Sequence, residues 1–463
     1  MQLQGRNVLV VGLATSGAAV AEFLLEKGAR VHVTDAKSEA ELQAAVDRLS
    51  RVSTTLDSTL RVTLGRHEER DFLEAHLIVL SPGVPLSLPP LQKARQKGVP
   101  VIAEVELASR FLKGKIVAIT GSNGKTTTTS LVGELFRSAG RACTVAGNIG
   151  TPLIGVVKDS RDDQMHIVEL SSFQLETIDQ FRPHVAALLN VTPDHLDRYP
   201  SMDAYFEAKR RVFMNQRADD FAVLNADDSW CARATEGLVA RPFFFARSRH
   251  EFEGVSIAGS QIVIRKGKIT ERVLELQDIP LKGSHNVENV MAAVGVGSLC
   301  GLDADSMRRA VQKFRGVEHR LEFVTTVEAV SFFNDSKATN VDAAIKAIES
   351  FEGPLILILG GKDKGSNYGP LRPALEQRCR AAVLLGAAAE KIAAVLQGAV
   401  PLLRARDMRH AVELGFTAAH PGDTVILAPA CASFDMFDNY EHRGRIFKEE
   451  VRRLAAGKVG SPS

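Results

Sequence analysis

The stretch KIVAITGSNGKTTTTS, Lys115 to Ser130, decides the fold of the central part of this chain. A short apolar run leads into a glycine-rich turn, and a helical pattern follows. In that context backbone N–H groups and the helix N-terminus face a phosphate. Only Ser122 and Asn123 separate Gly121 from Gly124, whereas the usual triphosphate loop places four residues there. The stretch predicts a shortened phosphate loop, and a tight strand–helix turn with an exposed lysine is the alternative.

The chemistry of such a loop needs a cation for the phosphates and an acid for the metal. Lys125 can neutralise the terminal phosphates, and the Thr126 hydroxyl can ligate Mg²⁺. Glu169 ends the apolar run HIVE. Because the carboxyl ends of parallel strands share one edge, we expect Glu169 to face the loop and to hold Mg²⁺ directly or through water. A surface carboxylate at a strand end is the alternative.

Two further candidate residues lie in the part of the sequence that follows the next predicted strand. His195 follows the next predicted strand, in TPDHLDRY. A lone histidine is more often a structural or surface residue than a ligand, but the position of His195 at the same sheet edge supports a functional role as well. Lys209 lies on the helical pattern YFEAKRRVF. From the residues alone, a basic helix face in water is the favoured interpretation of Lys209.

The bulk properties indicate a large water-soluble protein. The chain has 463 residues, and a prior of about 150 residues per domain suggests three domains. Its net charge of +2 gives no support for a nucleic-acid or anionic-membrane surface, and its apolar runs have the length of strands. The start, MQLQGRNVLVVGL, reads as a first strand rather than a signal peptide. Five scattered cysteines, without metal spacing, indicate inert thiols in a reduced, cytoplasmic protein.

Strand and helix patterns alternate along nearly the whole chain, which predicts parallel sheets covered by helices. The pattern divides into blocks 1–104, 105–315 and 316–463: a Rossmann-like domain, a phosphate-loop ATPase-type α/β domain with a mostly parallel sheet, and a second Rossmann-like domain. The expected strands lie at residues 7–12, 29–35, 77–85, 99–107, 115–120, 166–170, 184–191, 330–334, 354–361, 381–386 and 423–430, with a β-rich region at 221–280.

The turn after the first strand is a degenerate dinucleotide motif. It reads Gly12, Ala14 and Gly17, with an alanine in place of the middle glycine. Asp35 closes the second strand, where such folds often hold a ribose. A nucleotide site and a plain structural turn are both compatible with this pattern.

Taken together, the motifs resemble those of the Mur ligases, three-domain ATP-dependent amide ligases of bacterial cell-wall synthesis. The family uses the shortened loop, and the resemblance covers nearly the full length. SSFQLE and DSKATN are most specific for members that add D-glutamate, and the Asn-Pro-Arg loop of ligases that add a diamino acid does not occur. The matching motifs are TGSNGKTT (120–127), GNIG (147–150), ELSSFQLE (169–176), NVTPDHLDRY (190–199), HNVEN (285–289), HRLE (319–322), NDSKATN (334–340), LGGKDKG (359–365) and PACASFD (429–435).

The resemblance implies an ATP site with two Mg²⁺ ions. Lys125, Glu169, His195 and Lys209 are the implied catalytic residues, and Lys209 matches the lysine that family members carry as a CO₂-derived carbamate. Carbamylation needs a neutral amine, so the ordinary lysine pKa of about 10.4 must be depressed or CO₂ captured in the brief neutral state. The implied metal residues are Thr126, Glu169, His195 and carbamylated Lys209; the implied ATP residues are Gly121, Ser122, Asn123, Gly124, Lys125, Thr126, Thr127, Asn286, Asn289, Arg320 and Asp335.

The resemblance also implies two small-molecule substrates and a monomer without a membrane span or a nucleic-acid partner. UDP-N-acetylmuramoyl-L-alanine would be bound by Ser16, Asp35, Lys37, Ser81, Gly83 and Asn148. D-Glutamate would be bound by Lys337, Thr339, Lys364, Ser433, Phe434 and Tyr440. The chain departs from the family at Ala36 and Lys37, where Thr-Arg is common, so Lys37 keeps the charge without the planar guanidinium fork. Phe434 and Tyr440 are departures as well.

The implied reaction proceeds through an acyl phosphate. The L-alanyl carboxylate attacks the γ-phosphate of ATP, the D-glutamate amine attacks the acyl phosphate, and the products are the amide, ADP and phosphate. Three alternatives are a ligase for another amino acid, including folate polyglutamylation, an NAD(P)-dependent oxidoreductase built on the first domain, and a nucleotide-switched binding protein. The substituted middle glycine and the second phosphate site count against the oxidoreductase.

Overall fold

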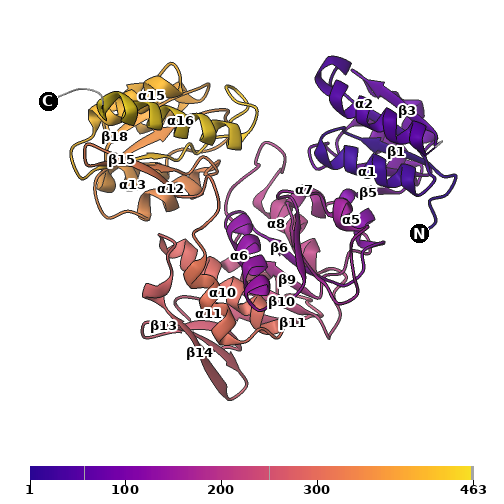
Figure 1. The fold of residues 1–463 in the computed structure, drawn as a ribbon, viewed down its shortest axis with the longest axis horizontal. Coiled ribbons are helices and arrows are strands. Elements are labelled where there is room, and N and C mark those ends of the chain that lie inside the picture. Colours follow the sequence, from indigo (N-terminus) through magenta and orange to yellow (C-terminus); the bar gives the residue numbers. More distant parts are fainter. Residues whose placement is uncertain (57, 250, 460–463) are drawn as a thin grey trace.

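The computed structural model describes residues 1–56, 58–249 and 251–459. Within these residues the strands form three separate sheets, one in each of three lobes (Figure 1). In Figure 1 the indigo N-terminal lobe and the yellow C-terminal lobe lie on the same side of the central lobe. The described helices include none long and apolar enough to cross a membrane.

The first sheet is entirely parallel, with strand order β3-β2-β1-β4-β5. Its central strand, β1, is a run of Val and Leu that is buried on both faces, as a parallel strand between helices requires. The strands are β1 Asn7–Val11, β2 Arg30–Asp35, β3 Leu60–Leu64, β4 Leu77–Leu80 and β5 Val101–Ala103; the helices are α1 Thr15–Glu26, α2 Glu39–Thr55, α3 Glu69–Leu73 and α4 Pro89–Gln96.

The second sheet has the order β14-β13-β12-β11-β10-β9-β6-β8-β7 and is parallel from β7 to β12. Its last two pairings, β12–β13 and β13–β14, are antiparallel. The strands are β6 Lys115–Thr120, β7 Cys143–Gly147, β8 Met165–Glu169, β9 Val185–Leu188, β10 Phe221–Asn225, β11 Arg241–Phe245, β12 Gly254–Ala258, β13 Gln261–Lys266 and β14 Ile269–Glu275.

Helices cover both faces of this sheet because its central strands are apolar on both sides. In Figure 1, α6 and α10 run side by side next to the sheet, and α7 and α8 lie near the first lobe. The helices are α5 Glu104–Ser109, α6 Lys125–Ser138, α7 Ser172–Leu175, α8 Met202–Arg210, α9 Ser229–Arg233, α10 Ser284–Leu299 and α11 Ala304–Lys313, with short 3₁₀ turns at Leu153–Val156, Arg211–Phe213 and Leu276–Asp278.

The third sheet has the order β15-β16-β20-β17-β18-β19, with only the β15–β16 pair antiparallel. Two apolar clusters, one on each face, hold its helices. The strands are β15 Glu322–Val327, β16 Val330–Asn334, β17 Leu355–Leu359, β18 Cys379–Leu384, β19 Leu402–Arg404 and β20 Thr424–Leu427; the helices are α12 Val341–Glu349, α13 Leu371–Arg378, α14 Ala389–Leu396, α15 Met408–Ala418 and α16 Tyr440–Val459.

The predicted fold class is confirmed, but the sequence-based assignment of strands is wrong or incomplete at the sheet edges. The expected strand at 99–107 ends at Ala103, and Glu104 begins helix α5 instead. Strands β3, β7, β15 and β19 were not expected, and each is an edge strand. An edge strand such as β3 is only half-buried, so its residues do not form the apolar run by which the central strands are recognised.

The five cysteines are free thiols, as expected. Burial raises the pKa of each of these thiols above its ordinary value, which keeps them protonated and unreactive at neutral pH.

Helix α5, directly after the first sheet, is fixed to the central lobe by a buried carboxylate. Glu106 is fully buried, and its Oε2 accepts hydrogen bonds of 2.8, 3.0 and 2.8 Å from the backbone N–H groups of residues 179–181. Arg110 donates to its Oε1 at 2.6 Å. The charge is thereby satisfied on both oxygens, as a buried carboxylate requires.

We expect Glu106→Ala to destabilise the central lobe by about 3 kcal/mol, because three buried donors and the Arg110 guanidinium lose their acceptor. Differential scanning calorimetry should show a transition several degrees lower. The matched control is Glu134→Ala, which removes an exposed pair with Arg137 and should change little. Equal effects of the two substitutions would contradict the role assigned to Glu106.

Candidate active site

The turn between β6 and α6 has the geometry of a phosphate loop. Gly124 caps α6 with φ +83°, in the left-handed region that favours glycine. A Cβ at this position would lie 2.2 Å from Asn289 Oδ1 of α10. The segment that follows β9 fixes the loop as well, because the Asn123 backbone N–H donates to Asn190 Oδ1 at 2.8 Å. Gly124 is therefore required both by the backbone and by the close approach of α10.

Lys125 is folded over this loop. Its Nζ donates to the carbonyls of Gly121 and Ser122, both at 2.8 Å. Burial lowers the pKa of Lys125, while Glu169 and Asp194 act in the opposite direction. The lysine therefore lies beside the carboxylate that the sequence predicts as its metal-binding partner.

Glu169 and His195 carry lone pairs that are available for a cation. Glu169 is 1% exposed; its Oε1 accepts from Asn148 Nδ2 at 3.0 Å, and its buried Oε2 has no hydrogen-bond partner among the described residues. His195 adopts φ +54°, and burial lowers its pKa to about 4, against the opposing effect of Asp194. A neutral imidazole and an unpaired carboxylate oxygen suit a divalent cation.

Lys209 lies on α8, as predicted, but the solvated helix face favoured from the residues alone is wrong. It is 1% exposed, and its Nζ donates to the Gly121 carbonyl at 2.8 Å and lies 4.5 Å from the centre of the Tyr205 ring. The side of α8 that carries Tyr205, Phe206 and Lys209 is buried. Burial and the charge of Lys125 hold the pKa of Lys209 well below its ordinary value.

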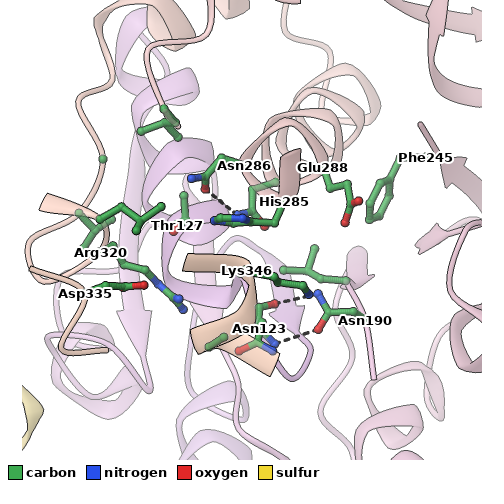
Figure 2. Close-up of a pocket in the computed structure, with 18 residues that line it drawn as sticks. Asn123, Thr127, Asn190, Phe245, His285, Asn286, Glu288, Arg320, Asp335 and Lys346 are labelled. Carbon is green, nitrogen blue, oxygen red and sulfur yellow. Dashed lines mark hydrogen bonds between the residues drawn. The ribbon is translucent and has the colours of Figure 1, made fainter. Parts of the chain in front are cut away.

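A pocket beside the loop is formed by the central and third lobes together (Figure 2). Asn286 and Asn289 of α10 line it from one side, and Arg320 and Asp335 line it from the third lobe. Arg320 Nε and Asp335 Oδ1 are buried and lack a hydrogen-bond partner within the described parts of the chain. Burial raises the pKa of Asp335 to about 6, although Arg320 opposes this shift. Such orphaned polar atoms indicate that a polar ligand completes the pocket.

The pocket also contains residues that the sequence analysis did not assign. His285 stands within the motif HNVEN and could have been included from its position beside Asn286. The apolar side chains of Leu189, Phe245, Leu281 and Val317 come from separate strands and turns, and Glu288 and Lys346 from two helices. Glu288 is the acid of HNVEN and could have been included together with His285. No local pattern marks the other residues, because only the tertiary fold brings them together.

Asp194 is a further unassigned residue, next to His195. Its Oδ1 lies 3.0 Å from Lys364 Nζ, and its Oδ2 accepts from Asn340 Nδ2 at 3.0 Å, so it joins the central lobe to the third. Burial opposes its ionisation, but Lys364 and His195 hold its carboxyl pKa below the ordinary value. Lys364, predicted to bind D-glutamate, is therefore ion-paired across the two lobes in this structure.

The other predicted D-glutamate residues come from the third lobe. Lys337 Nζ donates to Tyr440 Oη at 2.9 Å, and burial lowers the pKa of this lysine to about 8. The Thr339 backbone N–H donates to the Lys337 carbonyl at 2.8 Å. Ser433 is buried, whereas Phe434 is 67% exposed.

The residues predicted for the uridine substrate gather in part around the turn after β1. Asp35 Oδ2 accepts from the Leu13 N–H at 2.6 Å, and Ser81 Oγ donates to the Gly12 carbonyl at 2.9 Å. Lys37 is exposed and donates its backbone N–H to Asp35 Oδ1 at 2.8 Å. Ser16 lies in the first turn of α1, and Gly83 is exposed after β4. Asn148 lies apart from this group, against Glu169 in the central lobe.

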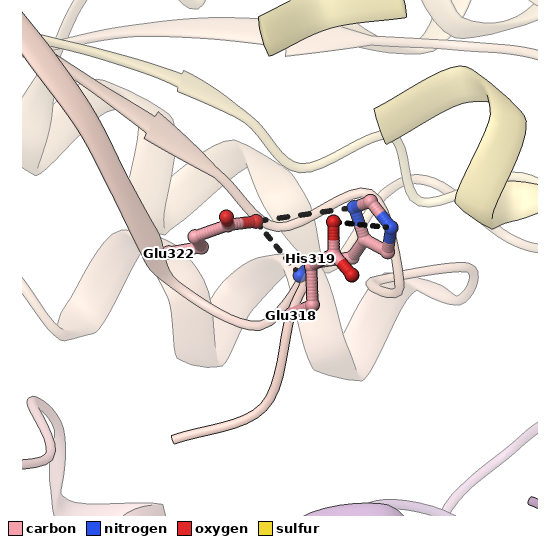
Figure 3. A group of neighbouring side chains, drawn as sticks. All are labelled: Glu318, His319 and Glu322. Atoms are coloured by element: carbon pink, nitrogen blue, oxygen red, sulfur yellow. Dashed lines mark hydrogen bonds and ion pairs between the residues drawn. The ribbon is translucent and has the colours of Figure 1, made fainter. Parts of the chain in front are cut away.

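Glu318, His319 and Glu322 bring three possible metal ligands within 4.8 Å of one another (Figure 3). Lys448 Nζ already lies 2.6 Å from Glu318 and 2.9 Å from Glu322, and Asn334 Nδ2 donates to His319 Nδ1 at 2.9 Å. All three side chains therefore already have partners, and together they form an ion-pair network at the start of the third lobe.

The central lobe has a phosphate loop with a buried acid beside it, and the third lobe completes the adjoining pocket. These features define a multidomain enzyme that acts on a nucleotide. Residues 6–103 match the family described as "Mur ligase MurD-like, N-terminal domain", residues 119–297 the "Mur ligase middle domain" and residues 319–431 the "Mur ligase, glutamate ligase domain". The chain belongs to the Mur ligase family, as the sequence motifs predict. This family depends on ATP and Mg²⁺, and the chain is a ligase of peptidoglycan precursor synthesis.

Two relatives carry the name UDP-N-acetylmuramoylalanine–D-glutamate ligase. The protein of Koribacter versatilis is 50% identical over 98% of this chain and 99% of its own, and that of Acidobacterium capsulatum is 52% identical over 97% of each. Among solved structures, the UDP-N-acetylmuramate-alanine ligase of Thermotoga maritima has a TM-score of 0.61 and 17% identity, and covers 97% of this chain and 100% of that one. At that identity the likeness shows the fold alone.

We expect Gly124→Ala to weaken nucleotide binding by more than about tenfold, because the added methyl group meets Asn289 and the left-handed backbone is strained. Isothermal titration with ADP measures the effect. Gly140→Ala is the matched control, since Gly140 also has positive φ (+65°) but open space around its Cβ. Equal nucleotide affinities for the two variants would contradict the assigned role of the loop.

Proposed function

We propose that this chain joins D-glutamate to UDP-N-acetylmuramoyl-L-alanine, with conversion of ATP to ADP and phosphate. The observation that carries this proposal is the convergence of Lys125, Glu169 and Lys209 on one phosphate loop that faces a pocket closed by the third lobe. The names of the two relatives, each about half identical over nearly full length, support the choice of substrates.

ATP would be bound by the loop and by residues on both sides of the pocket. Gly121, Ser122, Asn123 and Gly124 would face the phosphates, and Asn286 and Asn289 the adenine side. Arg320 and Asp335, whose buried polar atoms lack hydrogen-bond partners within the described chain, would contact ATP from the third lobe. Thr127 lines the same pocket.

Two Mg²⁺ sites would be formed by Thr126, Glu169, His195 and Lys209. The unpaired Glu169 Oε2 and the neutral His195 ring fit this role. When bound, the metal ions offset the charge of the phosphates during transfer. Lys125 supplies a further positive charge from the protein itself.

Lys209 would be carbamylated by CO₂. The reaction requires a neutral amine, and the depressed pKa of this buried lysine increases the neutral fraction at physiological pH. The product is an anion beside Lys125, so the carbamate would attract the Lys125 ammonium group.

The reaction would begin with attack of the L-alanyl carboxylate on the γ-phosphate, which gives an acyl phosphate. The D-glutamate amine then attacks the acyl carbon, and the tetrahedral intermediate collapses with loss of phosphate. His195 or a neighbouring basic group would assist deprotonation of that amine, and the low pKa of His195 limits its strength as a base. Water must be excluded, which fits a site that closes between lobes.

The two substrates would approach from opposite lobes. The uridine part would lie at Ser16, Asp35, Lys37, Ser81 and Gly83, with Asn148 at the muramoyl end. D-Glutamate would lie among Lys337, Thr339, Lys364, Ser433, Phe434 and Tyr440. For Lys364 to meet a carboxylate of D-glutamate, its ion pair with Asp194 must be shared or exchanged.

The domain limits 1–104, 105–315 and 316–463 are part of the proposal, supported by the three separate sheets. We also propose a cytoplasmic location, because the substrates are soluble intracellular precursors, and a monomeric state. Size-exclusion chromatography with light scattering tests the oligomeric state.

Phosphate release with UDP-N-acetylmuramoyl-L-alanine tests the reaction against a panel of D- and L-amino acids. We expect D-glutamate to be the preferred acceptor and Lys125→Ala to lose activity by a factor of about 10³ or more, because transition-state charge is no longer offset. Circular dichroism checks the fold of the variant. Preference for another amino acid would refute the proposed acceptor, and full activity of Lys125→Ala would refute the loop assignment.

Lys209→Ala should be nearly inactive and partly rescued by a short-chain carboxylic acid, which replaces the missing carbamate anion. The initial rate is measured at increasing acetate concentration. Arg210→Ala is the matched control, because Arg210 is adjacent in the sequence but pairs with Glu207 away from the loop. Rescue that is absent in Lys209→Ala, or equal in both variants, would argue against the carbamate.

A further inference from the structure

Helix α12 of the third lobe begins against the phosphate loop of the central lobe. Asp342, in its first turn, accepts a hydrogen bond from Asn123 Nδ2 at 2.5 Å. The same carboxylate oxygen accepts from Thr192 Oγ1 at 3.1 Å. The loop is predicted to bind triphosphate. One of its side-chain donors, the Asn123 amide, is thus already hydrogen-bonded to a carboxylate of another lobe.

One helical turn further on, Lys346 faces the same carboxylate. Its Nζ lies 3.0 Å from Asp342 Oδ2, at the i,i+4 spacing that brings side chains together on one helix face. Lys346 lines the nucleotide pocket, and Figure 2 shows it between Asn123 and Asn190 on one side and His285 on the other. Its charge helps to lower the pKa of His285 and acts against the burial that raises the pKa of Glu288. The positive field of Lys346 therefore reaches both walls of the pocket.

An incoming polyanion such as a nucleotide would meet two donors that already have a partner. The Asn123 amide and the Lys346 ammonium group are both engaged by Asp342. Phosphate oxygens need the same kinds of donors, and charge-assisted hydrogen bonds to phosphate are stronger than neutral ones. The Asp342 carboxylate also repels a phosphate chain placed beside it. The nucleotide and Asp342 therefore compete for two donors that come from different lobes.

We propose that Lys346 is a nucleotide-binding residue supplied by the third lobe, and that Asp342 is its positioning counter-ion, which holds Lys346 and Asn123 until phosphate oxygens displace it. This inference rests on the proposed function, in which a nucleotide occupies this pocket. Lys346 adds a cation to Arg320 on the same side, so two positive charges from the third lobe face the nucleotide. Binding of the nucleotide is thereby linked to contact between the lobes.

The proposal predicts opposite effects for two substitutions within one ion pair. Lys346→Gln removes a cation from the pocket and should weaken binding of a nucleoside triphosphate by about tenfold, the usual effect of one charged hydrogen bond. Asp342→Asn removes the competing negative charge and leaves only a neutral acceptor for the two donors, so it should strengthen binding severalfold. If the pair served only to stabilise α12 or the contact between the lobes, both substitutions would weaken binding.

Isothermal titration of the full chain with a non-hydrolysable ATP analogue and Mg²⁺ measures these affinities. Lys346→Arg keeps the charge and should retain most of the affinity. The matched control is the pair Arg409 and Glu413 on α15, which has the same i,i+4 spacing at 3.0 Å but lies outside the pocket. Arg409→Gln and Glu413→Gln should leave the affinity unchanged. Thermal melting of each variant checks that α12 remains folded.

The outcomes separate this inference from the proposed function. If the unsubstituted chain fails to bind the analogue, the proposed nucleotide site is wrong, and the inference falls with it. If the unsubstituted chain binds, but Asp342→Asn weakens binding or Lys346→Gln leaves it unchanged, the nucleotide site stands and the roles assigned to Lys346 and Asp342 are refuted.

Discussion

One backbone carbonyl, that of Gly121 at the end of β6, organises the centre of this molecule. It accepts hydrogen bonds from the amines of both Lys125 and Lys209, each at 2.8 Å. Burial is the main cause that lowers the pKa of each amine, and the charge of Lys125 lowers the pKa of Lys209 further. An anion at the loop, or on Lys209 itself, would offset the positive charge of these amines. The proposed triphosphate and the proposed carbamate would both supply such an anion.

The parallel sheet explains why these groups meet. Strands β6, β8 and β9 are neighbours, so the loop, Glu169 and the segment that carries His195 leave the sheet at the same edge. Lys209 reaches the site from α8, on a helix face that is otherwise apolar. The desolvation that depresses its pKa thus follows from the same packing that holds the helix on the sheet. Stability and reactivity are linked here, because solvent access to α8 would return the lysine to its ordinary charged state.

The sequence was most informative where function depends on local geometry. A strand followed by Gly-x-x-Gly-Lys-Thr can be recognised within ten residues, so the loop, Lys125 and the strand that ends at Glu169 could be predicted. The burial of Lys209 could not, because its neighbours Tyr205 and Phe206 do not reveal which side of α8 meets the sheet. Strands β3, β7, β15 and β19 were missed for a related reason. Their partial exposure at sheet edges weakens the apolar pattern that marks an interior strand.

The contacts between the central and third lobes had no sequence signal at all. Asp194, Asn340 and Asp342 lie within or beside motifs that were recognised, yet their pairing joins residues about 150 positions apart. In each contact a carboxylate of one lobe accepts a hydrogen bond from a donor of the other lobe. Lys364 and Asn123 are both residues predicted to bind substrates, and both are held in this way by the opposite lobe. If these residues bind the ligands as proposed, the ligands would exchange with contacts between the lobes, and substrate binding would be thermodynamically coupled to the arrangement of the lobes. The coupling follows from the small number of polar donors around one phosphate loop and does not require a separate regulatory site.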